Sequence, residues 1–175
     1  LPKFALDIRG GNSNLVNDIL APSKMSVRSF MLTADNDSNL VLNGIARRFD
    51  TGSMLIDTIT IDGKQHGAHL HFGAGMANRP GNLDEWHKVI LKGMIDGNQA
   101  RLGLHQENLK GKTGYQFGLG ASASRADSTI TVNIKPFKPI IGYQKWIVNE
   151  DNFISYRIPD QHIDANLHMQ GGNSS

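Results

Sequence analysis

The alternation of apolar residues with polar residues or glycines is the feature that most constrains the fold of this chain. In residues 67–76 every second position is apolar, and the positions between them are glycine or histidine. Successive side chains of a strand point to opposite faces, so a period of two predicts a sheet with one apolar and one polar face. The pattern returns in residues 40–46, 89–95, 100–104, 115–119, 130–134 and 163–169. No helical pattern supplies a partner to cover that face, so what it contacts is the functional question.

One short helix is expected near residues 13–21. Asn12 to Asn14 offer an N-cap, Leu15 to Leu20 carry apolar residues at helical spacing, and Pro22 ends the helix. A weaker alternation over residues 3–9 favours a strand before it, and one more helical turn is expected over Leu83 to Lys88.

Turn signals separate the remaining apolar runs. The dipeptides Asp62-Gly63 and Asp96-Gly97 are typical of tight hairpins. Further turns are expected at residues 36–39, 108–111, 125–128 and 159–160. The pattern predicts about ten strands of roughly 6–11 residues, joined as a meander. Residues 1–175 are interpreted as one unit, with two faint hairpin repeats near 40–76 and 89–123.

Composition excludes several classes of function. A chain of 175 residues can bury one sizeable core, and its net charge of +2 comes from scattered basic residues rather than from a nucleic-acid-binding stripe. There is no cysteine, hence no disulfide framework or thiolate metal site. No apolar run approaches the ~20 residues of a membrane span. The chain opens on Leu1-Pro2 and stops soon after a strong strand pattern, so we interpret it as a segment of a longer protein, with any anchor or export signal outside it.

The sequence predicts no enzyme. It contains no nucleophile elbow, zinc-protease or phosphate-loop motif, and no catalytic residue stands out. His69 and His71 share one strand face, with His66 just before them, which permits a metal hypothesis. Polar histidines on the wet face of an amphipathic strand explain the same pattern, so we expect no metal and no cofactor.

Glycines occur inside the strand patterns as well as between them. Such positions mark bends or close approaches, which a strongly curled sheet needs, although a tight sandwich that packs small residues is an alternative. The glycines concerned are Gly67, Gly73, Gly75, Gly93, Gly103, Gly114, Gly118 and Gly120.

The C-terminal third resembles a known family. The run from Trp146 to Tyr156, followed by Gln161 to Met169, is similar to the TamB proteins of the AsmA-like group, in the manner of their Bacteroidetes-type members. The Leu-x-Gly-x units at Leu42 and Leu91 and the scarcity of helix are similar too, and the likeness extends over residues 38–172. The chain is thereby identified as an internal fragment of such a protein.

That resemblance implies a long periplasmic protein, anchored in the inner membrane by a segment outside this chain. Such proteins form a taco-shaped sheet whose apolar, concave face holds lipid acyl chains. They are implicated in phospholipid transport to the outer membrane, and in protein translocation and assembly there beside a partner barrel of the Omp85 class. The resemblance transfers no catalytic or ligand motif to individual residues.

We therefore expect an all-β, elongated, curled antiparallel sheet that forms an open groove, with one short N-terminal helix. Its function is predicted to be shielding of phospholipid acyl chains, without nucleic acid or cofactor. The alternative is a structural or adhesive β-sandwich domain without lipid binding, since the same alternation suits that fold. The residues predicted to line the groove are Leu70, Phe72, Val89, Leu91, Leu102, Leu104, Phe117, Leu119, Val132 and Leu167.

Overall fold

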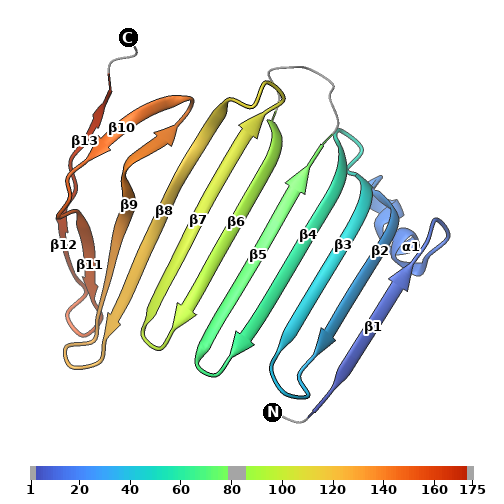
Figure 1. Ribbon diagram of the computed structural model, residues 1–175, viewed down its shortest axis with the longest axis horizontal. Helices are drawn as coiled ribbons and strands as arrows, with labels where there is room; N and C mark the ends of the chain where they lie inside the picture. Colours follow the sequence, from blue (N-terminus) through green and yellow to red (C-terminus); the bar gives the residue numbers. More distant parts are fainter. Residues whose placement is uncertain (1–2, 79–85, 173–175) are drawn as a thin grey trace.

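The computed structural model describes residues 3–78 and 86–172, which form an open antiparallel sheet with one short helix (Figure 1). Nine strands follow one another across the sheet in chain order, as the predicted meander requires. They are β1 (Ala5–Gly10), β2 (Ser26–Asp35), β3 (Val41–Asp50), β4 (Leu55–His66), β5 (His69–Ala77), β6 (Trp86–Asp96), β7 (Gln99–Asn108), β8 (Thr113–Ser124) and β9 (Thr129–Ile141).

Four shorter strands complete the sheet beyond β9. They are β10 (Gln144–Val148), β11 (Phe153–Arg157), β12 (His162–Asn166) and β13 (Met169–Gly171). The described residues thus form thirteen strands of 3 to 13 residues, where the sequence predicted about ten of more even length. The all-β class and the curled, antiparallel architecture are confirmed.

The short helix near the N-terminus also forms as expected. Helix α1 spans Leu15–Leu20 and is followed by a 3-10 turn over Ala21–Ser23. Asn14 is the N-cap, and its side-chain oxygen accepts a hydrogen bond of 3.0 Å from the backbone N–H of Asn17. The Asn17 side chain in turn bonds both backbone groups of Val27, at 2.7 and 3.0 Å, which ties α1 to β2.

Two of the predicted local features are wrong. Asp62-Gly63 is no turn, because β4 runs on to His66 and Gly63 pairs with Leu42 on one side and Phe72 on the other. The hairpin closes instead at Gly67, where φ is +60°, a conformation that glycine adopts without steric cost. The helical turn expected over 83–88 is a strand from Trp86 onward, and residues 83–85 lie outside the described residues.

The other turn predictions are confirmed. β6 ends at Asp96 and β7 begins at Gln99, with Gly97 at φ +57° between them. The four polar breaks at residues 36–39, 108–111, 125–128 and 159–160 likewise separate consecutive strands. Leu40 lies just before β3, and its carbonyl accepts a backbone hydrogen bond of 2.8 Å from Gln65.

The sheet divides after β9. The first part of β9 pairs with β11 and its last residues pair with β10, so that β10 and β11 act as two halves of one interrupted neighbouring strand. β13 and β12 continue the two halves outward. The peptide bond between Lys135 and Pro136 is cis, and the register of β8 against β9 shifts at this point.

Asparagine side chains replace the missing ladder at this division. Asn152 is buried, accepts a hydrogen bond of 2.6 Å from the Ile134 N–H and donates one of 3.1 Å to the Ile134 carbonyl. Asn149 plays a similar part between β12 and β13. Its side chain accepts a hydrogen bond of 2.8 Å from the His168 N–H and donates one of 3.2 Å to the Asn166 carbonyl. The backbone polar groups at the interruption therefore keep partners.

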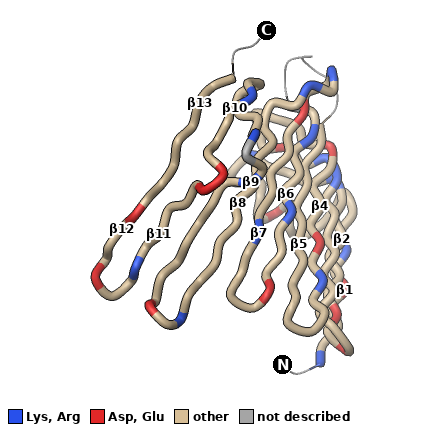
Figure 2. Tube along the Cα trace, turned by 60° about the vertical axis from the view of Figure 1, so that its left-hand side comes forward, with Lys and Arg blue, Asp and Glu red and all other residues tan. Residues whose placement is uncertain are grey.

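The fold is a single layer rather than a packed sandwich. Figure 2 shows one curled sheet with β1 and β12 at its opposite ends, and no second sheet covers either face within the described residues. The chain exposes 11841 Å², whereas a compact protein of this mass exposes about 8,400 Å². Buried apolar side chains in the described part are confined to Val27, Ala34, Ile56, Pro139 and Val148. A closed sandwich, the alternative that the sequence left open, is not what the chain forms.

Among the described residues, none of the helical structure is long and apolar enough to cross a bilayer.

Candidate functional site

Register places one continuous set of apolar residues on the same side of the sheet, which we call the apolar face. Directly paired residues of antiparallel strands project from the same face, so rows of partners can be followed from strand to strand. One row crosses nine strands as Leu6, Ala34, Leu42, Gly63, Phe72, Gly93, Leu102, Leu119 and Ile134. The next crosses eight as Ile8, Leu32, Gly44, Ile61, Ala74, Leu91, Leu104 and Phe117.

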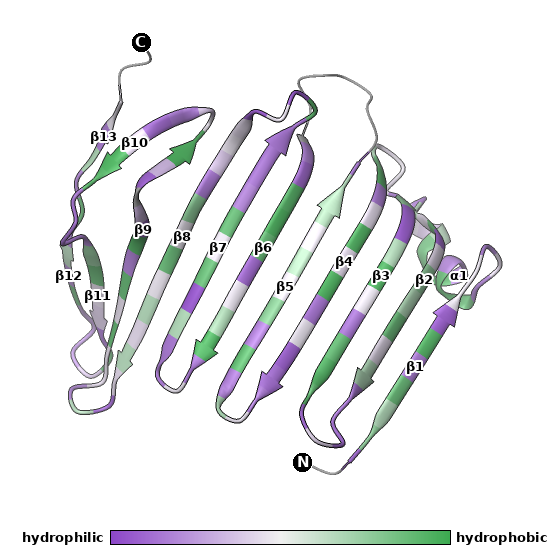
Figure 3. Ribbon diagram, viewed as in Figure 1, coloured by the Kyte–Doolittle hydropathy of each residue, from purple (hydrophilic) through white to green (hydrophobic). Residues whose placement is uncertain are grey.

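These two rows contain no polar side chain. Figure 3 shows the consequence, with hydrophobic and hydrophilic residues alternating along most strands. The positions between the apolar residues belong to the opposite side, which we call the polar face. One row of that face is Asp7, Thr33, Asn43, Asp62, Gly73, Lys92, Gly103, Gly118 and Lys135.

Nine of the ten predicted lining residues share the apolar face. They come from five consecutive strands: Leu70 and Phe72 from β5, Val89 and Leu91 from β6, Leu102 and Leu104 from β7, Phe117 and Leu119 from β8, and Val132 from β9. Leu167 lies apart from them, between β12 and β13, because the run predicted as one strand is interrupted there.

The side chains of the apolar face are only partly covered. Leu119 is 36% exposed, Ile61 39% and Ile95 41%, although all three lie in the middle of the sheet or near a hairpin end of a central strand. In a packed domain such positions form the core and are excluded from water. Here the side chains cover one another laterally and leave their ends free, so the face has the character of an unfilled binding surface.

Several glycines of the apolar face lie beneath large neighbours. A Cβ at Gly93 would overlap the ring of Phe72, and a Cβ at Gly10 would overlap the ring of Phe30. Gly44 stands in the same relation to Ile61. Glycine at these positions lets a bulky cross-strand partner lie flat across the sheet, which keeps the face smooth. Gly67 is the exception among the glycines predicted inside strands, because it forms a turn.

The polar face carries hollows where its glycines cluster. The largest, about 820 Å³, lies over β6 to β9, and two smaller ones of about 270 and 370 Å³ flank it. Sequence reasoning missed them, since it interpreted the glycines as bends and the basic residues as scattered. The sequence did contain a signal for one of these contacts. Lys92 and Gly103 are equally distant in sequence from the turn at Gly97 and Asn98, so they pair with each other across the hairpin.

The histidine cluster does not assemble a metal site. His66 and His69 are cross-strand partners beside the Gly67 turn, and His71 is two residues further along β5. His69 Nδ1 lies 3.1 Å from Asp96 Oδ1, a pair in which both side chains are about half exposed. Within the described residues, no group of three or more His, Cys, Asp or Glu side chains is arranged to hold a metal ion.

Carboxylates with shifted pKa values lie outside the apolar face. A hydrogen bond from Arg9 lowers the pKa of Asp7 and raises that of Arg9, in an exposed ion pair of 2.8 Å on the polar face of β1. At the division of the sheet, a hydrogen bond from the Asn149 side chain lowers the pKa of Asp151, aided by its own backbone N–H and by Asn166. All three shifts arise from local hydrogen bonding of the kind that favours the ionised form.

Comparison of the chain with protein-family models, curated proteins and solved structures finds no match, so the geometry of its two faces is what bears on function.

Proposed function

We propose that this chain is a segment of an inter-membrane conduit whose apolar face shields lipid acyl chains from water. The observation that supports the proposal is the pair of uninterrupted apolar rows across eight and nine strands, uncovered by any other layer of the described chain. Exposed apolar area on this scale marks an interaction surface.

The dimensions of the face suit a lipid chain. Nine strands spaced ~4.8 Å apart extend over roughly 38 Å, whereas one leaflet of a bilayer core is only ~15 Å thick. An acyl chain lying across the strands therefore finds apolar contacts along its whole length and could be followed by another.

Movement along such a face requires little energy once the chain is bound. Each methylene removed from water contributes about 0.8 kcal/mol. Because neighbouring strands present equivalent apolar residues in each row, a sliding chain exchanges one set of contacts for a similar set. The surface supplies solvent exclusion only, so direction must be imposed by other parts of the system.

The resemblance to the TamB family sets the proposed context. In that context the full protein is periplasmic, is anchored in the inner membrane outside this chain, and supports phospholipid transport and protein assembly at the outer membrane. Contact with a barrel of the Omp85 class is assigned to other parts of the protein. The segment acts without catalysis, cofactor or nucleic acid.

Site-specific photo-crosslinking tests the proposal. A photoreactive amino acid at Leu70 or Phe117 reports on the apolar face, and the same residue at Thr33 or Asn43 reports on the polar face, apart from the hollows over β6 to β9. We expect phospholipid adducts, identified by mass spectrometry, at the first pair and not at the second. Equal labelling of both pairs, or labelling at Thr33 and Asn43 alone, would contradict the proposal.

A further inference from the structure

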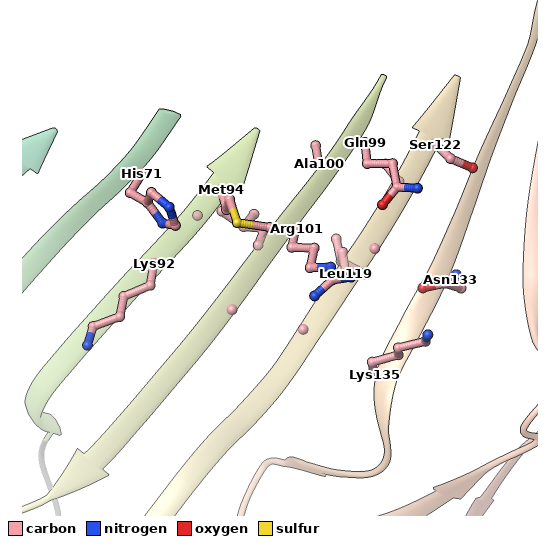
Figure 4. A pocket seen from close by; sticks show the side chains of 16 residues that line it. His71, Lys92, Met94, Gln99, Ala100, Arg101, Leu119, Ser122, Asn133 and Lys135 are labelled. Carbon is pink, nitrogen blue, oxygen red and sulfur yellow. The ribbon is translucent and has the colours of Figure 1, made fainter. Parts of the chain in front are cut away.

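The largest hollow of the polar face is a distinct feature from the apolar rows. It measures about 820 Å³ and spans β6 to β9, with His71 of β5 at its margin (Figure 4). Its floor is formed by Gly103, Gly118 and Gly120. The space above Gly103 is open, whereas the carbonyls of Lys135 and Leu102 lie close to Gly118 and the Asn133 side chain lies over Gly120.

Three basic residues lie next to that floor. Lys92 and Lys135 lie on either side of Gly103 and Gly118 in one row, about 14 Å apart at a strand spacing of ~4.8 Å. Arg101 lies in the adjacent row with Gly120 and Asn133. Figure 4 shows these side chains on three different strands, with Arg101 between the other two, Lys92 extending away from Arg101 and Lys135 extending toward Asn133. Among residues 3–78 and 86–172, no Asp or Glu lines the hollow.

These cations differ from three other basic residues of the chain, which are ion-paired. Lys3 pairs with Asp37 at 2.6 Å, Arg9 with Asp7 at 2.8 Å and Arg157 with Asp160 at 3.3 Å. Across residues 3–78 and 86–172, no carboxylate forms an ion pair with any of the three cations of the hollow. Gathering like charges without a counter-ion is unfavourable, and a bound anion relieves it.

The neutral groups complete the chemistry. Gln99 and Ser122 place an amide and a hydroxyl group at the hollow, and the Asn133 amide lies over Gly120. All three side chains are able to donate hydrogen bonds. A volume of about 820 Å³ is within the range of small-molecule sites. Arginine and lysine together are typical ligands of phosphate oxygens, Arg through its planar fork and Lys as a point charge.

We propose that this hollow, which we call the cationic hollow, binds a phosphate group, carried either by a lipid headgroup or by a soluble phosphate ester. It lies on the opposite side of the sheet from the apolar face, so the phosphate it takes belongs to a different molecule from an acyl chain bound there. The inference is therefore independent of the proposed lipid-shielding function.

Titration of the full chain with inorganic phosphate, followed by NMR amide shifts, tests the site without any acyl chain. We expect saturable shifts confined to residues near Arg101, Gly118 and Lys135. The double variant Arg101→Ala/Lys135→Ala should bind phosphate at least tenfold more weakly. The control double variant Arg125→Ala/Lys145→Ala makes the same change of net charge at exposed positions elsewhere, and should bind within twofold of the unmodified chain.

A second variant fills the hollow without removing any of its basic residues. A Cβ at Gly103 would meet only the Lys92 carbonyl, at 3.9 Å, so a side chain begins there without a clash. Gly103→Ile then extends into the hollow that Gly103 lines, while every cation remains. Isoleucine also suits a strand better than glycine does. We expect thermal stability to be kept and phosphate affinity to fall at least tenfold. Unchanged affinity in Gly103→Ile would overturn the site.

Vesicles distinguish the two sources of phosphate. Binding to vesicles that contain phosphatidylglycerol, absent with phosphatidylcholine alone and lost in Arg101→Ala/Lys135→Ala, identifies a lipid headgroup. Saturable binding of inorganic phosphate without vesicle binding identifies a soluble ester. Absence of localised phosphate shifts, or equal loss of affinity in the two double variants, refutes the proposal.

Discussion

Replacing Leu119 by arginine places a charge in the middle of the apolar face and tests whether that face is open to water. Leu119 is 36% exposed, so about two thirds of it is covered, and its direct cross-strand partners on the same face are Leu102 and Ile134. Full burial of a leucine is worth about 1.5–3 kcal/mol, so the covered part contributes about 1–2 kcal/mol.

Arginine at this position retains part of that contribution. Its methylene stem lies along apolar neighbours while the guanidinium extends into water. We expect Leu119→Arg to lower the free energy of unfolding by about 1 kcal/mol, with the sheet intact. In a closed core the same charge would be buried without a partner, at a cost of about 3–5 kcal/mol or more. The two arrangements therefore differ by several kcal/mol.

Urea unfolding followed by far-UV circular dichroism measures the difference. An unchanged m-value indicates that the same surface is exposed on unfolding, which validates the comparison. Val148→Arg is the matched control, because Val148 is only 2% exposed and a charge there should prevent folding. Under the proposed function, Leu119→Arg should also fold yet reduce phospholipid crosslinking at Leu70 and Phe117. A Leu119→Arg chain that is unfolded, or destabilised as strongly as Val148→Arg, would refute the open-face reasoning.

Three further predictions concern packing and the divided end of the sheet. Gly93→Ala should lower the unfolding free energy by about 1–3 kcal/mol, because its Cβ overlaps the Phe72 ring. In a double-mutant cycle, this loss of unfolding free energy should disappear when Gly93→Ala is combined with Phe72→Ala. Asn152→Ala should cost about 2–6 kcal/mol, since each of the two Ile134 backbone groups that loses its partner costs ~1–3 kcal/mol. The readout is faster amide exchange at Ile134 and in β10–β13, and unchanged exchange would contradict the prediction. The pKa of Asp151 is lower in the folded chain than in the unfolded chain. The carboxylate therefore contributes stability above the unfolded-state pKa of ~3.9, and this contribution is lost as pH falls through the folded-state pKa. Asp151→Asn should lower the free energy of unfolding at neutral pH, and the difference from the unmodified chain should vanish in acid.

The local features of this fold could be predicted from the sequence alone. Period-two alternation identified the strands and assigned nine of the ten predicted lining residues to one face. The N-cap at Asn14 and the turn at Gly97 were also predictable, because each depends on residues within a few positions of one another. Because the sequence contains no helical pattern that could cover the apolar face, it also predicted an open face.

Tertiary structure decided whatever depends on pairing between distant segments. Asp62-Gly63 has the residues of a turn, yet pairing with β3 and β5 keeps it extended, because register is set by whole strands rather than by one dipeptide. The division after β9 arises because Asn152 reaches back to Ile134, a contact that no local pattern announces. The cationic hollow joins Lys92, Arg101 and Lys135 only after three turns have fixed the register of four strands. Side-chain period is a property of each strand alone, whereas the neighbours of a residue across the sheet are a property of the assembled fold.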